Sequence, residues 1–565
     1  GGGRGGAMPS RRAALLLLLL PPSAALAGEW IARTLPQRTT SASRAELSEQ
    51  GGQSQSRALV LRVDGRWYNV AEWAERHPGG AYCLKWVAGY DVSAIFHTIH
   101  LFGRKNAAAI LSQLPELDES QLPARPSTEL LVFPDIRRVP KAMQPPIFED
   151  WVLGRDVERD VAAGPPEPFQ MRASGDRRAW SAMDAARDTP FKLELEAMLH
   201  RNFKSPAHYK ATPEHWARIA LAFGLTASCL ARWAQGDVFA TLALPWAQWM
   251  LFSSAVHESS HHTLSTNPKL NLAAMFLGMP FIYNPVIWYH QHIVSHHQYP
   301  NDENLDVDLH HLRPARMHPH TERDEGASGI HFLFKGYFTT AGMTVLWPIR
   351  HLVRRPTARF YTLNTPAPAN VPAAQLVLSL LPAAVVNLYP FWLVASGEAN
   401  PAFGLFLWLF PWLGTGAIWT VMTQVSHAQA DAQEPPGYDD YFRWQVESAV
   451  DYSVGSRLVP MLTASLNFQS MHHAMPSVCG CHFHKLYPEY KAICERHGVR
   501  LNTRADLAEA WRTNVERVFE LSSEPDEPVV WRHLGGNLAI YLAAPYLLFA
   551  APLLTLSAVL DGAKY

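Results

Sequence analysis

Five long apolar segments constrain the fold of this chain more than any other feature. They have 19–23 residues each, and an α-helix needs about 20 residues to cross ~30 Å of hydrocarbon. The first four fall into two close pairs, which predicts helical hairpins in a membrane. A further apolar stretch, 272–289, is broken by Pro280 and Pro285, so we expect it to lie at the membrane interface or to re-enter. The five segments lie near residues 216–234, 238–256, 373–395, 402–424 and 537–559.

Charge and cysteine content exclude two classes of protein. The net charge of −1 leaves no basic surplus to neutralise phosphates, so we expect no nucleic acid partner. Cys479 and Cys481 form a CxC motif, but no second pair completes a zinc site. The five cysteines are scattered and odd in number, which excludes a disulfide framework and predicts ordinary reduced thiols: Cys83, Cys229, Cys479, Cys481 and Cys494.

Composition divides the chain into five parts. Residues 1–7 precede Met8 and resemble a tag, and the arginine-led apolar stretch after Met8 resembles a secretory signal. The alternative is a disordered N-terminus. Many prolines, which fix φ and remove a donor, predict a semi-extended linker. We expect a signal-like, transit-like or disordered segment (1–57), a small domain (58–113), the linker (114–170), a membrane domain (171–520) and a C-terminal extension with the fifth apolar segment (521–565).

The small domain contains the sequence His77-Pro78-Gly79-Gly80, followed by a second histidine at His100. Two histidines on opposed short helices can clamp one iron from both faces. With both axial positions filled, such a haem carries single electrons and has no site for dioxygen. Gly79 and Gly80 let the backbone turn where a side chain would strike the macrocycle. This segment resembles cytochrome b5 over about fifty residues. The resemblance implies haem b with His77 and His100 as axial ligands, and His97 is a competing candidate for the second position.

Three histidine clusters follow apolar segments. In the first, HESSHH at 257–262, positions i and i+4 share a helical face, so His257 and His261 can reach the same metal. In the second, HQHIVSHH at 290–297, His292 and His296 are again one turn apart, and His297 sits about 100° round to reach a second ion. The third is QSMHH at 469–473. Imidazole suits iron and leaves positions open for oxygen chemistry.

The spacing of these clusters resembles the three histidine boxes of membrane fatty acid desaturases. Gln469 in the third box, with a haem domain ahead, is similar to the front-end desaturases, and the resemblance covers roughly residues 58–500. It implies a catalytic site of two non-haem iron ions. The second box is HxxxHH where HxxHH is commoner, and Glu258 stands where the family often has aspartate. The residues that match as ligands are His257, His261, His292, His296, His297, His472 and His473, with Gln469 in place of a histidine and His427 as a supplementary histidine.

Other polar residues near the boxes are surplus to this set. We expect His262, His290, His310 and His311 to lie beside the ligands or at the surface. Asp306 and Asp308 can orient ligating imidazoles by accepting their other N–H.

The resemblance implies a mainly α protein, in which a small α+β haem domain precedes a polytopic helical membrane domain with a cytosolic di-iron cap. It implies an oxygen-dependent oxidoreductase of lipid metabolism that inserts a cis double bond into a long-chain, polyunsaturated fatty acyl substrate, carried as acyl-CoA or phospholipid. A nicotinamide-dependent cytochrome b5 reductase would supply the electrons. The alternatives are a sphingolipid desaturase, a lipid hydroxylase, and a non-catalytic membrane haem electron carrier.

The order of apolar segments and boxes places the chemistry on one side of a membrane. If the haem domain is cytosolic, each hairpin returns the chain to the cytosol, and the three boxes share that face. Arginines follow the positive-inside rule in the loop between the hairpins. We expect the endoplasmic reticulum, or a plastid membrane if the N-terminal segment is a transit peptide. The arginines are Arg350, Arg354, Arg355 and Arg359.

Overall fold

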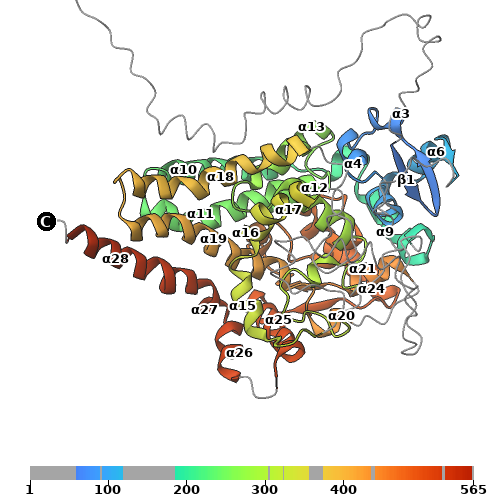
Figure 1. The fold of residues 1–565 in the computed structure, drawn as a ribbon. Coiled ribbons are helices and arrows are strands. Elements are labelled where there is room, and N and C mark those ends of the chain that lie inside the picture. The colour runs from blue at the N-terminus through green and yellow to red at the C-terminus, as the bar shows by residue number, and fades with distance from the viewer. Residues whose placement is uncertain are drawn as a thin grey trace, which may run out of the picture.

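The computed structural model describes residues 59–88, 92–118, 185–302, 306–321, 323–354, 373–433, 440–524 and 528–562. The predicted N-terminal segment at 1–57 and almost all of the predicted linker lie outside these residues, as do Arg355 and Arg359. Within them the chain is mainly helical, and a small α+β domain precedes a large helical domain (Figure 1). The predicted fold class is confirmed.

The small domain is built on an antiparallel sheet with the order β1-β2-β3. Val60 pairs with Asn69, and Tyr68 pairs with Glu116, so the sheet reaches beyond residue 113. The turn between β1 and β2 is Asp64-Gly65, where both φ values are positive, as in the type I′ turn that this dipeptide favours. The elements are β1 (Val60–Val63), β2 (Arg66–Asn69), α3 (Ala71–Ala74), α4 (Ala81–Trp86), α5 (Ser93–Ile99), η1 (Leu101–Gly103), α6 (Arg104–Leu111) and β3 (Glu116–Leu117).

The first four apolar segments form two packed hairpins, which lie side by side in Figure 1. Thr212 and Asp237 cap the first two helices by accepting backbone N–H groups. The second and fourth helices pack closely, because a Cβ at Gly414 would lie 2.6 Å from Cγ of Pro245. The helices are α10 (Pro213–Trp233), α11 (Val238–Leu251), α18 (Ala373–Ala395) and α19 (Pro401–Gln424).

The C-terminal apolar segment belongs to this bundle. It forms α27 (Leu538–Ala544), the π-helix η12 (Pro545–Ala550) and α28 (Ala551–Gly562), which pack against α19. Tyr541 donates its hydroxyl to the carbonyl of Leu333 at 3.2 Å. Among the described residues, Pro401–Gln424 and Leu538–Gly562 are the two helices long and apolar enough to cross a membrane.

Large apolar side chains cover the outside of the bundle. Phe239 is 82% exposed, Leu221 74%, Leu388 68% and Leu548 67%. Exposed apolar surface of this extent is unfavourable in water but suits hydrocarbon. The bundle therefore has the surface of a membrane domain.

The remaining helices form a cap at one end of the bundle, against which the small domain packs (Figure 1). The stretch 272–289 makes short helices and loops whose residues are largely buried in protein. The other elements are α9 (Pro190–Asn202), η5 (Pro206–Tyr209), η6 (Phe252–His257), α12 (Glu258–Ser260), α13 (Pro268–Met275), η7 (Phe276–Gly278), α14 (Pro285–Trp288), η8 (Tyr289–His296), η9 (Val307–Leu309), α15 (Gly329–Gly336), α16 (Thr339–Ala341), η10 (Gly342–Leu346), α17 (Trp347–Arg354), α20 (Ala430–Gln433), α21 (Tyr441–Glu447), β4 (Val450–Tyr452), α22 (Val459–Thr463), α23 (Gln469–Ala474), η11 (Gly480–His482), α24 (Phe483–Arg496), β5 (Asn502–Arg504), α25 (Leu507–Ser522) and α26 (Val529–Gly536).

Candidate functional site

The first box continues the second membrane helix without a break. After α11 the backbone widens into the π-helix η6, which ends at His257, and α12 leads to His261. Both imidazoles are buried, and their ring centroids are 5.1 Å apart. The apolar helix thus delivers the first two candidate ligands to the interior of the cap.

The second box is also a π-helix, η8, and this changes which histidines face each other. The His297 N–H donates to the carbonyl of His292 at 2.9 Å, an i to i+5 bond. Nε2 of His292 and Nε2 of His297 lie 3.2 Å apart. α-Helical spacing placed His292 and His296 on one face, with His297 turned toward a second ion. In the structure His292 and His296 instead point to separate groups of histidines. The reason is that a π-helical turn contains more residues than an α-helical turn.

The third box is α23, which Asp451 of β4 holds at its start. The carboxylate of Asp451 accepts the Ser470 N–H at 2.8 Å and the Ser470 hydroxyl at 2.7 Å. These bonds fix the helix so that His472 and His473 both enter the cap interior, where they are buried.

The boxes converge on two adjacent groups of imidazoles. Within each group the ligand atoms lie within 4.8 Å of one another. The ring of His297 lies between the groups, with centroids 4.4 Å from His261 and 4.4 Å from His473. Nε2 of Gln469 is 3.0 Å from Nε2 of His427. The first group is His257, His261, His292 and His472, and the second is His296, His427 and His473.

These side chains fit a pair of metal ions. Both ring nitrogens of His257 and Nε2 of His472 are buried without a hydrogen-bond partner, which is costly for a polar atom unless a metal binds it. Burial lowers the pKa of His261, His292 and His472 well below the ordinary value, so the rings are neutral and can donate a lone pair. Neutral imidazole donors suit iron.

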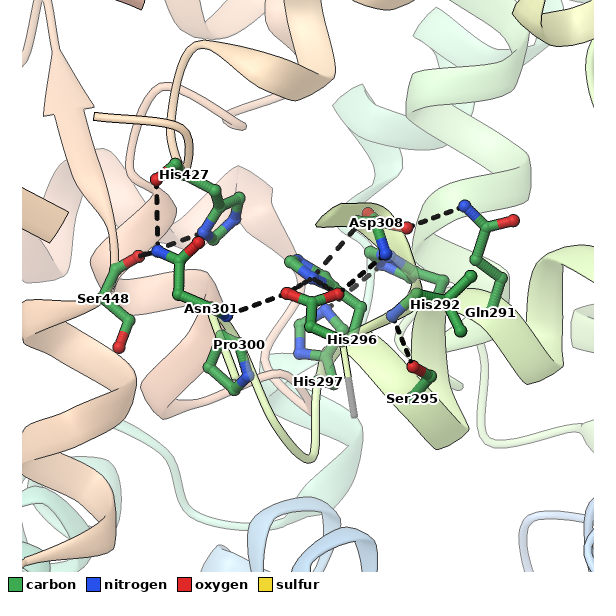
Figure 2. A network of polar contacts seen from close by, with 12 residues as sticks. Gln291, His292, Ser295, His296, His297, Pro300, Asn301, Asp308, His427 and Ser448 are labelled. Atoms are coloured by element: carbon green, nitrogen blue, oxygen red, sulfur yellow. Dashed lines mark hydrogen bonds and ion pairs between the residues drawn. The ribbon is translucent and has the colours of Figure 1, made fainter. Parts of the chain in front are cut away.

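Polar partners aim the imidazoles of the second group, and Figure 2 shows the surroundings of His296 and His427. Nδ1 of His296 lies 3.1 Å from the buried carboxylate of Asp306. Burial opposes a charge on His296, but Asp306 and Asp308 raise its pKa to about 9. Nδ1 of His427 donates to the Ser448 carbonyl at 3.1 Å, and Nδ1 of His473 donates to Oε1 of Gln445 at 3.0 Å. Each contact leaves Nε2 directed into the group.

Asn301 joins the loop after the second box to the segment that carries His427 (Figure 2). Its Nδ2 donates to the carbonyls of His427 at 3.1 Å and Ser448 at 3.0 Å. Its backbone N–H donates to Asp306 at 2.8 Å. One residue therefore holds both the orienting carboxylate and the supplementary histidine.

The small domain presents a bis-imidazole pocket. The ring centroids of His77 and His100 are 6.3 Å apart. A metal–imidazole bond is about 2 Å long, so an ion between two such rings leaves their centroids roughly 6 Å apart. Nδ1 of His100 donates to the Phe96 carbonyl at 2.8 Å, which leaves Nε2 as the donor atom. A Cβ at Gly79 would lie 2.9 Å from the His77 ring, so the glycine makes room for the ligand.

His97, the competing axial candidate, has another partner. Its Nε2 lies 3.0 Å from the carboxylate of Asp64 in the β1–β2 turn. The ring is buried in that position. The geometry therefore fits a haem between His77 and His100.

The small domain docks on the first two boxes. The hydroxyl of Tyr82 lies 3.1 Å from Nδ1 of His262, the residue after His261. Nε2 of His290 lies 2.9 Å from the carbonyl of Trp86, and Trp86 meets Tyr289 edge to face at 5.3 Å. The two surplus histidines thus belong to the interface between the haem pocket and the metal groups.

An aromatic-lined cavity of about 30 Å³ adjoins both metal groups. Trp288 stacks on His292 with ring centroids 4.0 Å apart. His311 also lines this cavity, and His310 is buried nearby. The apolar part of the wall is formed by Phe252, Tyr283, Trp288, Trp419, Met422 and Leu466.

Several residues that shape the site were not found from the sequence. Asn301, Gln445 and Asp451 lie far from the boxes in the chain or outside any motif. Tyr82 and Trp86 follow the HPGG turn at helical spacing, which is equally typical of a buried core. Their roles depend on contacts between distant segments.

Comparisons with known proteins agree with both halves of this arrangement. The family described as "Fatty acid desaturase" matches residues 206–505, and "Cytochrome b5-like Heme/Steroid binding domain" matches residues 43–119. An acyl-lipid omega-13 desaturase of Chlamydomonas reinhardtii is 27% identical, covering 81% of this chain and 93% of the relative. An acyl-lipid (8-3)-desaturase of Mortierella alpina is 23% identical, covering 83% and 95%. A Delta(8)-fatty-acid desaturase 2 of Arabidopsis thaliana is 22% identical, covering 82% and 89%.

Proposed function

Because the chain belongs to the fatty acid desaturase family, with a cytochrome b5-like domain fused ahead, we propose that it inserts a cis double bond into the acyl chain of a membrane lipid. It is an oxidoreductase of lipid metabolism and a membrane protein. The family uses haem in the first domain and a di-iron centre in the second. The observation that carries the proposal is the convergence of the boxes on two groups of buried imidazoles beside an aromatic cavity.

The proposed ligands of the two irons are eight imidazoles, seven from the three boxes and that of His427. When bound, the irons would supply oxygen activation and the haem would supply single electrons. Asp306, Gln445 and the Ser448 carbonyl hold their histidines in the tautomer that directs Nε2 inward. His77 and His100 are the proposed axial ligands of the haem.

The wall beside the histidines is largely aromatic, which favours an apolar substrate. Trp288 and Trp419 meet edge to face at 5.4 Å and form part of this wall. A saturated acyl segment, which makes no hydrogen bonds, would pack against such side chains. The fully buried Tyr283 packs against both tryptophans.

Electron entry through the docked domain fits the same function. The contact between Tyr82 and His262 brings the haem pocket against the first box. We propose a nicotinamide-dependent cytochrome b5 reductase as the external donor. The haem domain and the boxes would then face the cytosol, with the protein in the endoplasmic reticulum or a plastid membrane.

Gln469 favours a front-end enzyme within the family. The relatives carry names with different double-bond positions, omega-13 and 8-3 among them. We propose a long polyunsaturated acyl chain as substrate, presented on a phospholipid or on coenzyme A.

The test is expression of the full chain in a host supplied with defined polyunsaturated acids, with double-bond positions read by mass spectrometry. We expect one new cis double bond that disappears in His257→Ala. His533→Gln, a change at an exposed histidine of α26, is the control and should keep the product. Oxygen in the product would show that the protein is a hydroxylase. Conversion confined to the long-chain base of sphingolipids would show that it is a sphingolipid desaturase. No conversion, with full haem loading, would show that it is an electron carrier.

A further inference from the structure

A separate cluster of metal-ligand side chains lies where the start of α10 meets the segment after the third box. His215 is in the first turn of α10, and Cys479 and Cys481 precede α24. A ring nitrogen of His215 and the sulfurs of both cysteines lie within 4.8 Å of one another. His215 is 2% exposed and Cys479 is fully buried. The cluster shares no residue with the two imidazole groups of the boxes.

The imidazole of His215 has one nitrogen available. Nε2 lies 2.8 Å from the Ser254 carbonyl, to which it can only donate, so Nδ1 keeps its lone pair in the neutral ring. Nδ1 is buried and has no hydrogen-bond partner. A buried acceptor of this kind is expected to have a ligand.

The two thiols lie side by side. The Cys479 S–H donates to the sulfur of Cys481. Metals bind cysteine as the thiolate. Neither cysteine forms a disulfide.

A buried carboxylate fixes the backbone between the two cysteines. Both oxygens of Glu258 lie 3.3 Å from the N–H of Gly480, the residue between the two cysteines. Glu258 is 3% exposed and also accepts the hydroxyl of Thr263. A Cβ at Gly480 would lie 3.0 Å from Oε1 of Glu258, so a side chain at this position would crowd the contact.

We propose that His215, Cys479 and Cys481 bind one zinc ion. Two thiolates and one imidazole are donors that zinc prefers, whereas the imidazole-only boxes suit iron. The two thiol protons leave to solvent on binding, and no oxidation occurs. The ion ties α10 to the segment after the third box, so its role is structural.

The experiment measures metals in the full chain, purified from membranes without chelator. We expect one zinc per chain in addition to haem and non-haem iron. A mercurial that modifies thiols should release this zinc from the wild-type chain, read with a chromogenic chelator. Cobalt supplied during growth in place of zinc should give thiolate-to-cobalt charge-transfer absorption.

Cys481→Ser should lower zinc at least tenfold while haem absorbance and non-haem iron are retained. Cys494→Ser is the matched control, because Cys494 is a buried free cysteine of α24 outside the cluster, and it should keep the zinc. A wild-type chain without stoichiometric zinc, a Cys479–Cys481 disulfide found by mass spectrometry, or full zinc in Cys481→Ser would each overturn the proposal.

Discussion

The hydroxyl of Tyr82 lies 3.1 Å from Nδ1 of His262, although 180 residues separate them in the chain. Tyr82 is in the first turn of α4, behind the HPGG turn, and His262 directly follows a candidate iron ligand. A Cβ at Gly80 would lie 2.9 Å from Cβ of Pro268, so the domains also approach closely at this turn. The haem domain is thus seated on the first box.

We expect Tyr82→Phe to slow electron transfer from haem to the di-iron centre about two- to fivefold. It removes one hydrogen bond of the interface, worth about 1 kcal/mol, and leaves the ring in place. Reoxidation of reduced haem after addition of substrate and oxygen, followed by stopped-flow absorbance, measures the rate. Tyr546→Phe removes a hydroxyl that donates to the Leu242 carbonyl in the bundle and should leave the rate unchanged. Equal rates in both variants would remove this contact from the electron route.

We expect His77→Ala to abolish haem binding and desaturation while non-haem iron stays bound. The substitution removes one of two facing imidazoles and leaves the second domain intact. His97→Gln should keep the haem, because His97 contacts Asp64, and should cost about 1 kcal/mol of domain stability. The haem absorbance of the purified variants distinguishes the two histidines as axial ligands. Loss of haem in His97→Gln with retention in His77→Ala would reverse the assignment.

Gln469 is predicted to support the second metal group. Its amide lies 3.0 Å from Nε2 of His427, and its carbonyl oxygen or amide can also reach a metal or a bound water. Gln469→His should keep part of the activity, since imidazole is an accepted ligand. Gln469→Ile should abolish it and lower non-haem iron. Near-normal product and iron in both variants at equal expression would show that Gln469 only packs on the helix.

Asp306→Asn should weaken iron binding by roughly 10- to 100-fold, because Asp306 orients His296 from behind and also accepts the Asn301 N–H. Asp308→Asn is the matched variant. Its carboxylate is farther from Nδ1 of His296, at 3.7 Å, and more exposed, so we expect a smaller loss. Iron retained during dialysis against a chelator, measured per haem, ranks the variants. A larger loss in Asp308→Asn would contradict the role given to Asp306.

The sequence by itself determined the features that depend on short spacing. Helix length follows from an apolar run, so all five apolar segments formed helices, including the C-terminal one. The i and i+4 spacing of His257 and His261 places them on one face, and Asp64-Gly65 closes the hairpin of the haem domain. The family of each domain was predicted from the same short motifs and is confirmed.

Only the tertiary structure decided how the histidines are divided between the two metal groups and which residues surround them. The π-helix η8 pairs His292 with His297 and places His296 in the group of His427, an arrangement that α-helical spacing does not predict. Cys479 and Cys481 lacked a second pair in the sequence, and the fold brings them His215 from α10 and Glu258 from the first box. These contacts join segments hundreds of residues apart, so no local periodicity encodes them.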